Sequence, residues 1–396
     1  MTTVPTTPGS EAAGDQLTLW GTPHSLYTGK VRSYLVKKGL PYRELFPSHP
    51  RFAAAIVPVV GRMVVPVVET AEGEILQDST EIIEELERRS PEPAMIPATP
   101  LQRSVARLLD AWGCEGMLAT AMHYRWSYRA EQEHFLRAEF GRAIHSGPDR
   151  EARLAAGAAF MGYFGGMLPA LGVDPQTIPA IEAAHAELLE ALDIHFQHYP
   201  YLLGGRPCIA DFGFMAPLFA HLGRDPMPAS LMMKRAPNVY RWTERMNRAG
   251  IADGEFPDLP QTWLADDAVP ATLEPVLALL FRDWGPQLLA NAARLNAWLE
   301  ANPTLPAGQV VSHDGQPAVH PTLGAIEYAW RGVTVRAAST PHALWHFALA
   351  SAESRALAGP ARECFDALVE RLGGSEVMRI RLARPLARRN YALVLG

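Results

Sequence analysis

The sequence predicts an α/β domain, then an all-helical domain, and finally a region that mixes helices with short strands. In the first part, apolar residues alternate over 17–19 and turn residues follow, before a helix-period pattern opens at Ser25. A proline-rich stretch at 90–98 then precedes helix-period patterns that continue to about residue 248. Beyond these patterns, 326–337 reads as a hairpin of two short strands.

The chain of 396 residues is long enough for two or three domains. Changes in composition and in the period of the hydrophobic pattern give the predicted domain boundaries. We expect a disordered leader over 1–16, an α/β domain over 17–90, a helical domain over 99–250 and a C-terminal extension over 256–396.

In the α/β domain, strands and helices are expected to alternate. A helix from Ser25 follows the first strand, and a helix from Asp78, with Glu81 at capping-box spacing, follows the last. The segment 48–60 is expected to be irregular. The other expected strands are 42–46, 64–70 and 74–77.

In the helical domain, Thr99 and Pro100 form a helix start that leads into a long helix to about Arg129. The stretch 154–173 carries no charged residue and is long enough to span a membrane. Because alanine, glycine and Pro169 interrupt it, we expect a buried helix of a soluble bundle. In the extension, two helices broken near Pro286 are expected over 270–302.

Composition excludes several classes of function. With 36 basic and 42 acidic residues the net charge is −6, so the composition does not indicate a surface that binds nucleic acid. The three cysteines are far apart, so neither a disulfide framework nor a zinc site is expected, and a reducing cytoplasm suits them. The first residues lack the pattern of a secretory signal.

The stretch 17–32 combines a strand, a turn and a helix that opens at a hydroxyl residue. The free N–H groups of a helix start favour an anion, and a thiolate is one such anion. Two later segments fit the same frame: Val64-Val65-Pro66-Val67-Val68 and Gln77-Asp78-Ser79-Thr80. Together the three segments resemble the glutathione-binding, thioredoxin-like domain of the glutathione S-transferases, and the helical second half agrees. The resemblance covers about the first 250 residues.

This resemblance implies a glutathione site. The step between Val65 and Pro66 would be cis, with the Val65 backbone pairing with the cysteinyl part of glutathione, although an ordinary trans proline is the alternative. Asp78 and Ser79 would hold the γ-glutamyl end, although Asp78 can also serve only as a helix cap. Arg62 would pair with the glycyl carboxylate or remain a solvated surface arginine.

Ser25 is the predicted thiol-activating residue, because a hydroxyl within hydrogen-bond reach favours the thiolate. Its alternative is a purely capping role, with Thr28 or Tyr27 touching the sulfur instead. Tyr27, Trp112 and Tyr124 are predicted to line the site of the second substrate, although such an aromatic run is also typical of a core.

His342 and His346 lie four residues apart on one predicted helix face. No third ligand is evident in the sequence, so we expect a packing or surface role for them and no metal. Five arginines between 379 and 389 either bind an acidic partner or form a solvated face.

The sequence therefore predicts a cytoplasmic transferase that adds glutathione to a small hydrophobic electrophile, as in detoxification. The resemblance also implies a homodimer, with neither a nucleic-acid nor a membrane partner. The alternative is a non-catalytic binding or assembly module of the same fold. A different low-molecular-weight thiol could also replace glutathione in the same pocket.

Overall fold

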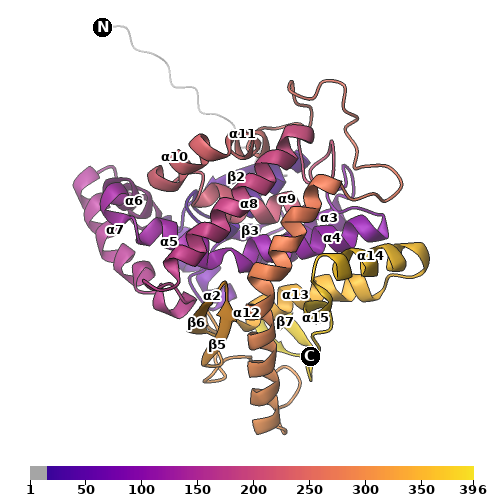
Figure 1. Cartoon of the computed structure of the whole chain (residues 1–396). Helices are drawn as coiled ribbons and strands as arrows, with labels where there is room; N and C mark the ends of the chain where they lie inside the picture. Colours follow the sequence, from indigo (N-terminus) through magenta and orange to yellow (C-terminus); the bar gives the residue numbers. More distant parts are fainter. Residues whose placement is uncertain (1–15) are drawn as a thin grey trace.

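The computed structural model describes residues 16–396 (Figure 1). Residues 1–15, which hold nearly all of the predicted leader, lie outside the described residues. The fold consists of an α/β domain, a helical domain and a C-terminal region of helices and two small sheets, as the sequence predicts.

The first domain is built on a four-stranded sheet of order β2-β1-β3-β4. β1 runs parallel to β2 and antiparallel to β3, which in turn runs antiparallel to β4. Residues such as Leu19 and Val68 face a buried core that α1 and α3 complete. The elements are β1 (Leu17–Trp20), α1 (Leu26–Lys38), β2 (Tyr42–Leu45), η1 (Phe52–Ile56), α2 (Val57–Val60), β3 (Val67–Glu69), β4 (Ile75–Gln77) and α3 (Ser79–Arg89).

The prediction that 48–60 is irregular was wrong, because this segment forms η1 and α2. Phe52, Ile56 and Val60 recur every four residues and are all buried against β1 and β3. This spacing places the three side chains on one helix face, and their burial stabilises a helix that local sequence alone does not specify.

The helical domain begins with α4 and is all-helical, as predicted. Its elements are α4 (Pro100–Ala111), η2 (Trp112–Gly116), α5 (Leu118–Trp126), α6 (Arg129–Ile144), α7 (Arg150–Gly165), η3 (Pro169–Leu171), α8 (Ile178–His198), α9 (Ile209–Ala220), α10 (Pro226–Arg235) and α11 (Pro237–Met246). The N-terminus of α4 is closed by Asp267, whose carboxylate accepts the N–H groups of Leu101 and Gln102, both at 2.8 Å.

The prediction of a buried helix over 154–173 was wrong. By length and composition, 150–171 could cross a membrane, yet only 11% of its apolar window is buried. α7 packs instead against α6 in a hairpin at the side of the molecule (Figure 1). The small residues of α7 serve that contact, since a Cβ on Gly157 would lie 2.1 Å from the Arg137 carbonyl oxygen. Phe160 and Tyr163 remain exposed.

The C-terminal region lies against the helical domain, with α13 and α14 packed on α4 (Figure 1). Its elements are η4 (Ala271–Leu273), α12 (Glu274–Ala301), β5 (Ala325–Trp330), β6 (Val333–Ala338), α13 (Pro341–Arg355), α14 (Gly359–Arg371), α15 (Ser375–Met378), β7 (Leu386–Arg389) and β8 (Ala392–Leu395). The predicted hairpin over 326–337 is confirmed as β5 and β6.

The predicted break near Pro286 was wrong, because α12 continues through that residue. Trp284 and Leu288 flank the proline and are both fully buried. Burial of these two large side chains on either side favours a continuous helix over the break that proline alone favours.

Candidate functional site

The register of the sheet brings the three segments that carry the resemblance to one edge. Trp20 pairs with Val67, and Val67 pairs with Gln77 on its other side. The loop that leads to Ser25 follows Trp20, the Val65–Pro66 step precedes Val67, and Asp78 follows Gln77. The ends of β1 and β4 and the start of β3 therefore share this edge.

Ser25 stands at the N-terminus of α1. Its backbone is extended, and its Oγ accepts the N–H of Thr28 at 3.4 Å, so the capping role predicted for Ser25 is present. The side chain is half-buried, whereas that of Thr28 is fully buried and packed against Gly21. Of these two hydroxyls, that of Ser25 is therefore the more accessible at the start of the helix.

The Val65–Pro66 peptide bond is cis, as the resemblance implies. Pro66 is buried at the start of β3, and Val65 is half-buried outside the paired strands. Within residues 16–396, no hydrogen bond engages the N–H or the C=O of Val65. Both groups are therefore free to pair with an extended peptide.

Asp78 and Ser79 form the start of α3. Asp78 adopts φ 85°, which is unusual for a residue with a side chain, and its Oδ1 accepts the Thr80 N–H at 2.9 Å. The capping role predicted for Asp78 is thus present. Ser79 is the first residue of the helix and is buried.

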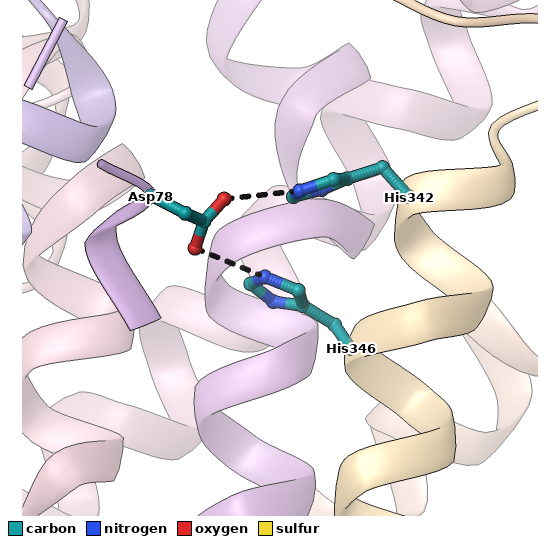
Figure 2. A group of neighbouring side chains, drawn as sticks. All are labelled: Asp78, His342 and His346. Carbon is teal, nitrogen blue, oxygen red and sulfur yellow. Dashed lines mark hydrogen bonds and ion pairs between the residues drawn. The ribbon is translucent and has the colours of Figure 1, made fainter. Parts of the chain in front are cut away.

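The C-terminal region reaches this same edge. The Asp78 carboxylate lies 3.0 Å from Nε2 of His342 and 3.9 Å from Nε2 of His346 (Figure 2). It also lies 3.9 Å from Nη1 of Arg388. Burial opposes the charged form, but the His342 hydrogen bond and the positive charges nearby hold the pKa of Asp78 well below its ordinary value. Asp78 is therefore a carboxylate that contacts a segment more than 260 residues away in sequence.

The hairpin of β7 and β8, which also belongs to the C-terminal region, contacts β4 and α3. Arg388 donates to the Gln77 side chain at 2.6 Å and to the Glu81 carboxylate at 3.0 Å. Tyr391 donates its hydroxyl to the Ile75 carbonyl oxygen at 3.2 Å, and its own carbonyl accepts from Arg62. Arg62 is therefore half-buried under the hairpin and bound to it.

Glu115 connects the start of α1 to the C-terminal region. Its Oε1 accepts the Tyr27 hydroxyl at 3.1 Å and lies 3.2 Å from Nδ1 of His342. Burial raises the pKa of Tyr27 well above its ordinary value, and the Glu115 charge adds to that effect. Tyr27 is therefore a neutral hydroxyl that donates to Glu115.

An apolar cleft lies between η2, α8 and the β5–β6 hairpin. Trp112 lines this cleft, together with Glu115 and His185. Tyr124 is buried next to it, 5.0 Å from the His185 ring and 5.8 Å from the Tyr128 ring between centroids. Of the three predicted substrate residues, only Trp112 borders the cleft directly. Tyr27 contacts Glu115, and Tyr124 contacts the ring of His185; Glu115 and His185 both line the cleft.

His185 carries an unsatisfied hydrogen-bonding capacity at this cleft. It is buried, and neither ring nitrogen has a partner within the described chain. Burial lowers the pKa of His185 to about 3, so the ring is neutral at pH 7.

Glu115, His185 and Arg388 were not predicted as site residues. His342 and His346 were predicted to have a packing or surface role, whereas both contact Asp78. No local pattern marks Glu115 or His185, because each is a single polar residue in a helical stretch. The four-residue spacing of the two histidines is visible in the sequence, but the residue opposite them is not.

Two family models match the chain. One, described as the glutathione S-transferase N-terminal domain, matches residues 19–94, and the other, described as the glutathione S-transferase C-terminal domain, matches residues 162–249. Among curated proteins no match was found.

Solved structures align with 60–64% of this chain. A glutathione S-transferase from Rhodospirillum rubrum is 19% identical over 64% of this chain and 96% of its own, with a TM-score of 0.35. One from Methylobacterium radiotolerans, in complex with glutathione sulfonate, is 22% identical over 64% of this chain and all of its own, with a TM-score of 0.36. The β-etherase LigF from a Sphingobium strain is 19% identical over 60% of this chain and 96% of its own, with a TM-score of 0.40.

The two matched domains occur in the family's order, and the first 250 residues form an α/β domain followed by an all-helical domain, as predicted. Residues 19–94 and 162–249 are thus the N-terminal and C-terminal domains of the glutathione S-transferase family, and the region beyond residue 250 is covered by neither family model.

Proposed function

We propose that the chain binds glutathione at the sheet edge and activates its thiol for attack on a small apolar electrophile. The observation that carries this proposal is the shared edge: the start of α1, the free backbone of Val65 and the start of α3 meet there. An extended peptide thiol laid along Val65 would have a helix N-terminus on each side.

In this proposal, Ser25 acts on the sulfur. Its hydroxyl would donate to the thiolate, and the N-terminal N–H groups of α1 would add to the stabilisation of the negative charge. The thiolate would form a carbon–sulfur bond with the electrophile, and the leaving group would depart with its electron pair. The cleft bordered by Trp112 would hold the apolar part of the electrophile.

The binding roles follow the geometry of α3. Ser79 and the free N–H groups at the helix start would hold the γ-glutamyl carboxylate, and Asp78 would hold the ammonium group. That ammonium group would take the place of His342 beside Oδ2 of Asp78. Arg62 would reach the glycyl carboxylate by exchanging its contact with the Tyr391 carbonyl.

Replacing Ser25 tests the activating role. We expect Ser25→Ala and Ser25→Gly to lower kcat/KM for conjugation to an aryl halide by about 10- to 100-fold, because a hydrogen bond to a charged group is lost. Glycine is nearly as good a helix cap as serine, so Ser25→Gly separates the hydroxyl from the cap. Ser25→Thr keeps a hydroxyl and is expected to retain most of the activity. Unchanged turnover and an unchanged pKa of the bound thiol in Ser25→Gly would refute this role.

One observation favours a second candidate, a non-catalytic module of the same fold. Asp78 and Arg62, two of the predicted glutathione contacts, are already engaged by His342, Arg388 and Tyr391 of the C-terminal region. Calorimetric titration separates the candidates, since heat of binding at millimolar glutathione supports the enzyme and its absence supports the module. The same titration with other low-molecular-weight thiols tests whether one of them is preferred.

Three further implications of the family belong to the same proposal: a homodimer, a cytoplasmic location and a role in detoxification. Analytical ultracentrifugation of the full chain tests the first, and fractionation of the producing cells tests the second. Growth of a deletion strain under electrophile stress tests the third.

A further inference from the structure

The contact between Asp78 and the C-terminal region has the composition of a metal site. Figure 2 shows the Asp78 carboxylate facing the two imidazole rings, with one oxygen toward each ring. The ligand atoms of Asp78, His342 and His346 all lie within 4.8 Å of one another. All three side chains are buried or half-buried.

The two histidines reach this point because they are four residues apart on α13, which places both rings on one face of the helix. Their ring centroids are 4.8 Å apart. The expectation of a packing role for these histidines rested on the lack of a third ligand in the sequence. The fold supplies that ligand from the cap of α3.

The spacing of the donor atoms suits one cation. Two ligand atoms that share a metal at bond lengths of about 2.1 Å lie roughly 3.0–3.4 Å apart. Oδ2 of Asp78 lies 3.0 Å from Nε2 of His342, at the lower end of that range, and Oδ1 of Asp78 lies 3.9 Å from Nε2 of His346, somewhat beyond it. The longer of the two exceeds hydrogen-bond length, so no direct hydrogen bond closes this side of the cluster.

A neighbouring carboxylate orients the His342 ring as a metal ligand requires. Nδ1 of His342 lies 3.2 Å from the Glu115 carboxylate, which holds the proton on Nδ1 and directs Nε2 toward Asp78. Nε2 of His346 lies 3.4 Å from the Thr80 hydroxyl, which itself accepts from the Lys30 ammonium at 3.1 Å. The Thr80 proton is therefore available to the Nε2 lone pair of His346, and a metal bound to this nitrogen would displace that contact.

Two carboxylates and one guanidinium lie around the cluster. The Asp78 and Glu115 carboxylates both face His342, and Nη1 of Arg388 lies 3.9 Å from Oδ2 of Asp78. A divalent cation bound to Nε2 of His342 would therefore have a carboxylate on each side of that ring, with the Arg388 charge opposing it.

We propose that Asp78, His342 and His346 bind a first-row divalent transition metal, while the Glu115 carboxylate holds the His342 ring in place through Nδ1. Two imidazoles and one carboxylate suit zinc, cobalt or nickel rather than magnesium or calcium, which prefer oxygen ligands. Three protein ligands leave a coordination position open. The metal joins the cap of α3 to α13 and competes with a γ-glutamyl ammonium group for the Asp78 carboxylate.

Cobalt titration of the tag-free full chain, stripped of metal and free of thiols, tests the site. We expect one Co²⁺ per chain, with visible d–d absorption that zinc abolishes. His342→Gln, His346→Gln and Asp78→Asn should each weaken binding by more than about 100-fold, and Glu115→Gln by about 10- to 100-fold. The exposed His313 supplies the control, since His313→Gln should bind as the wild type does.

Far-UV circular dichroism of each variant checks that it folds, and Asp78→Asn, which is nearly isosteric, separates ligation from packing. Absence of the absorption in the folded wild type would overturn the proposal. So would full binding by folded His346→Gln, because surface histidines would then hold the cobalt. The titration contains no glutathione, so its result is independent of the proposed transferase activity.

Discussion

Lys30 sits at the base of the site, where its buried ammonium group joins three helices. Its Nζ lies 2.7 Å from the Asp110 carboxylate on α4 and 3.1 Å from the Thr80 hydroxyl on α3, while Lys30 itself belongs to α1. The Lys30 side chain is 0% exposed and that of Asp110 is 5% exposed. Burial lowers the pKa of Lys30, but Asp110 raises it above its ordinary value, so the lysine stays charged.

Lys30→Met keeps the bulk of the side chain and removes the charge. The Asp110 carboxylate then stays buried without its cation, and breaking a buried pair in this way costs about 3–5 kcal/mol. In Lys30→Met with Asp110→Asn, no unpaired charge remains in the core. The double variant should therefore be more stable than Lys30→Met alone, by roughly 2–3 kcal/mol.

Urea unfolding, followed by far-UV circular dichroism and by tryptophan fluorescence, measures these differences. Coincidence of the two transitions justifies a two-state free energy. A cost below about 1 kcal/mol for Lys30→Met would refute the argument. Simple additivity of the two single substitutions in the double variant would also refute it, because the pair would then carry no coupling energy.

Three further outcomes follow from particular contacts. Asp267→Ala should cost about 1 kcal/mol in urea unfolding, because two N–H groups at the start of α4 lose their acceptor, and an unchanged midpoint would count against this cap. Gly113→Ala should lower Tm, because the added Cβ would lie 2.6 Å from the Gly213 carbonyl carbon, and an unchanged Tm would show that η2 and α9 can separate without cost. Because the folded pKa of His185 is about 3, the unfolded chain binds the extra proton between pH 6.5 and 3, so the free energy of unfolding should fall by about 1.4 kcal/mol per unit as pH falls through that range. His185→Phe should remove that share of the slope in acid unfolding, and an identical slope in the variant would contradict the assignment.

The parts of the site that could be predicted from the sequence are those whose structure is decided by residues close to them in the chain. Ser25 and Asp78 were both expected at helix starts, and the structure places them there because capping involves only the next few residues. The hairpin of β5 and β6 was predictable for the same reason, since its two-residue turn, Arg331-Gly332, can be recognised in the sequence.

The errors lie where packing against distant residues decides the structure. Pro286 remains inside α12 because the residues around it are buried by other elements, and α7 is exposed because it pairs mainly with α6. The contact of Asp78 with His342 spans 264 residues, and no spacing rule relates two such positions. The sequence therefore predicts the edge at which the site lies but not the helix that covers it.

That same separation along the chain has a consequence for how the protein is made. At about 5–20 residues per second, a ribosome needs roughly 13–53 s to pass from Asp78 to His342. Domains generally fold as they emerge, so the sheet and α4 would form while the Asp78 carboxylate is still bare to the surrounding water. Each nascent chain would thus begin with an uncovered edge, and that brief interval offers small thiols and metal ions a first opportunity to bind.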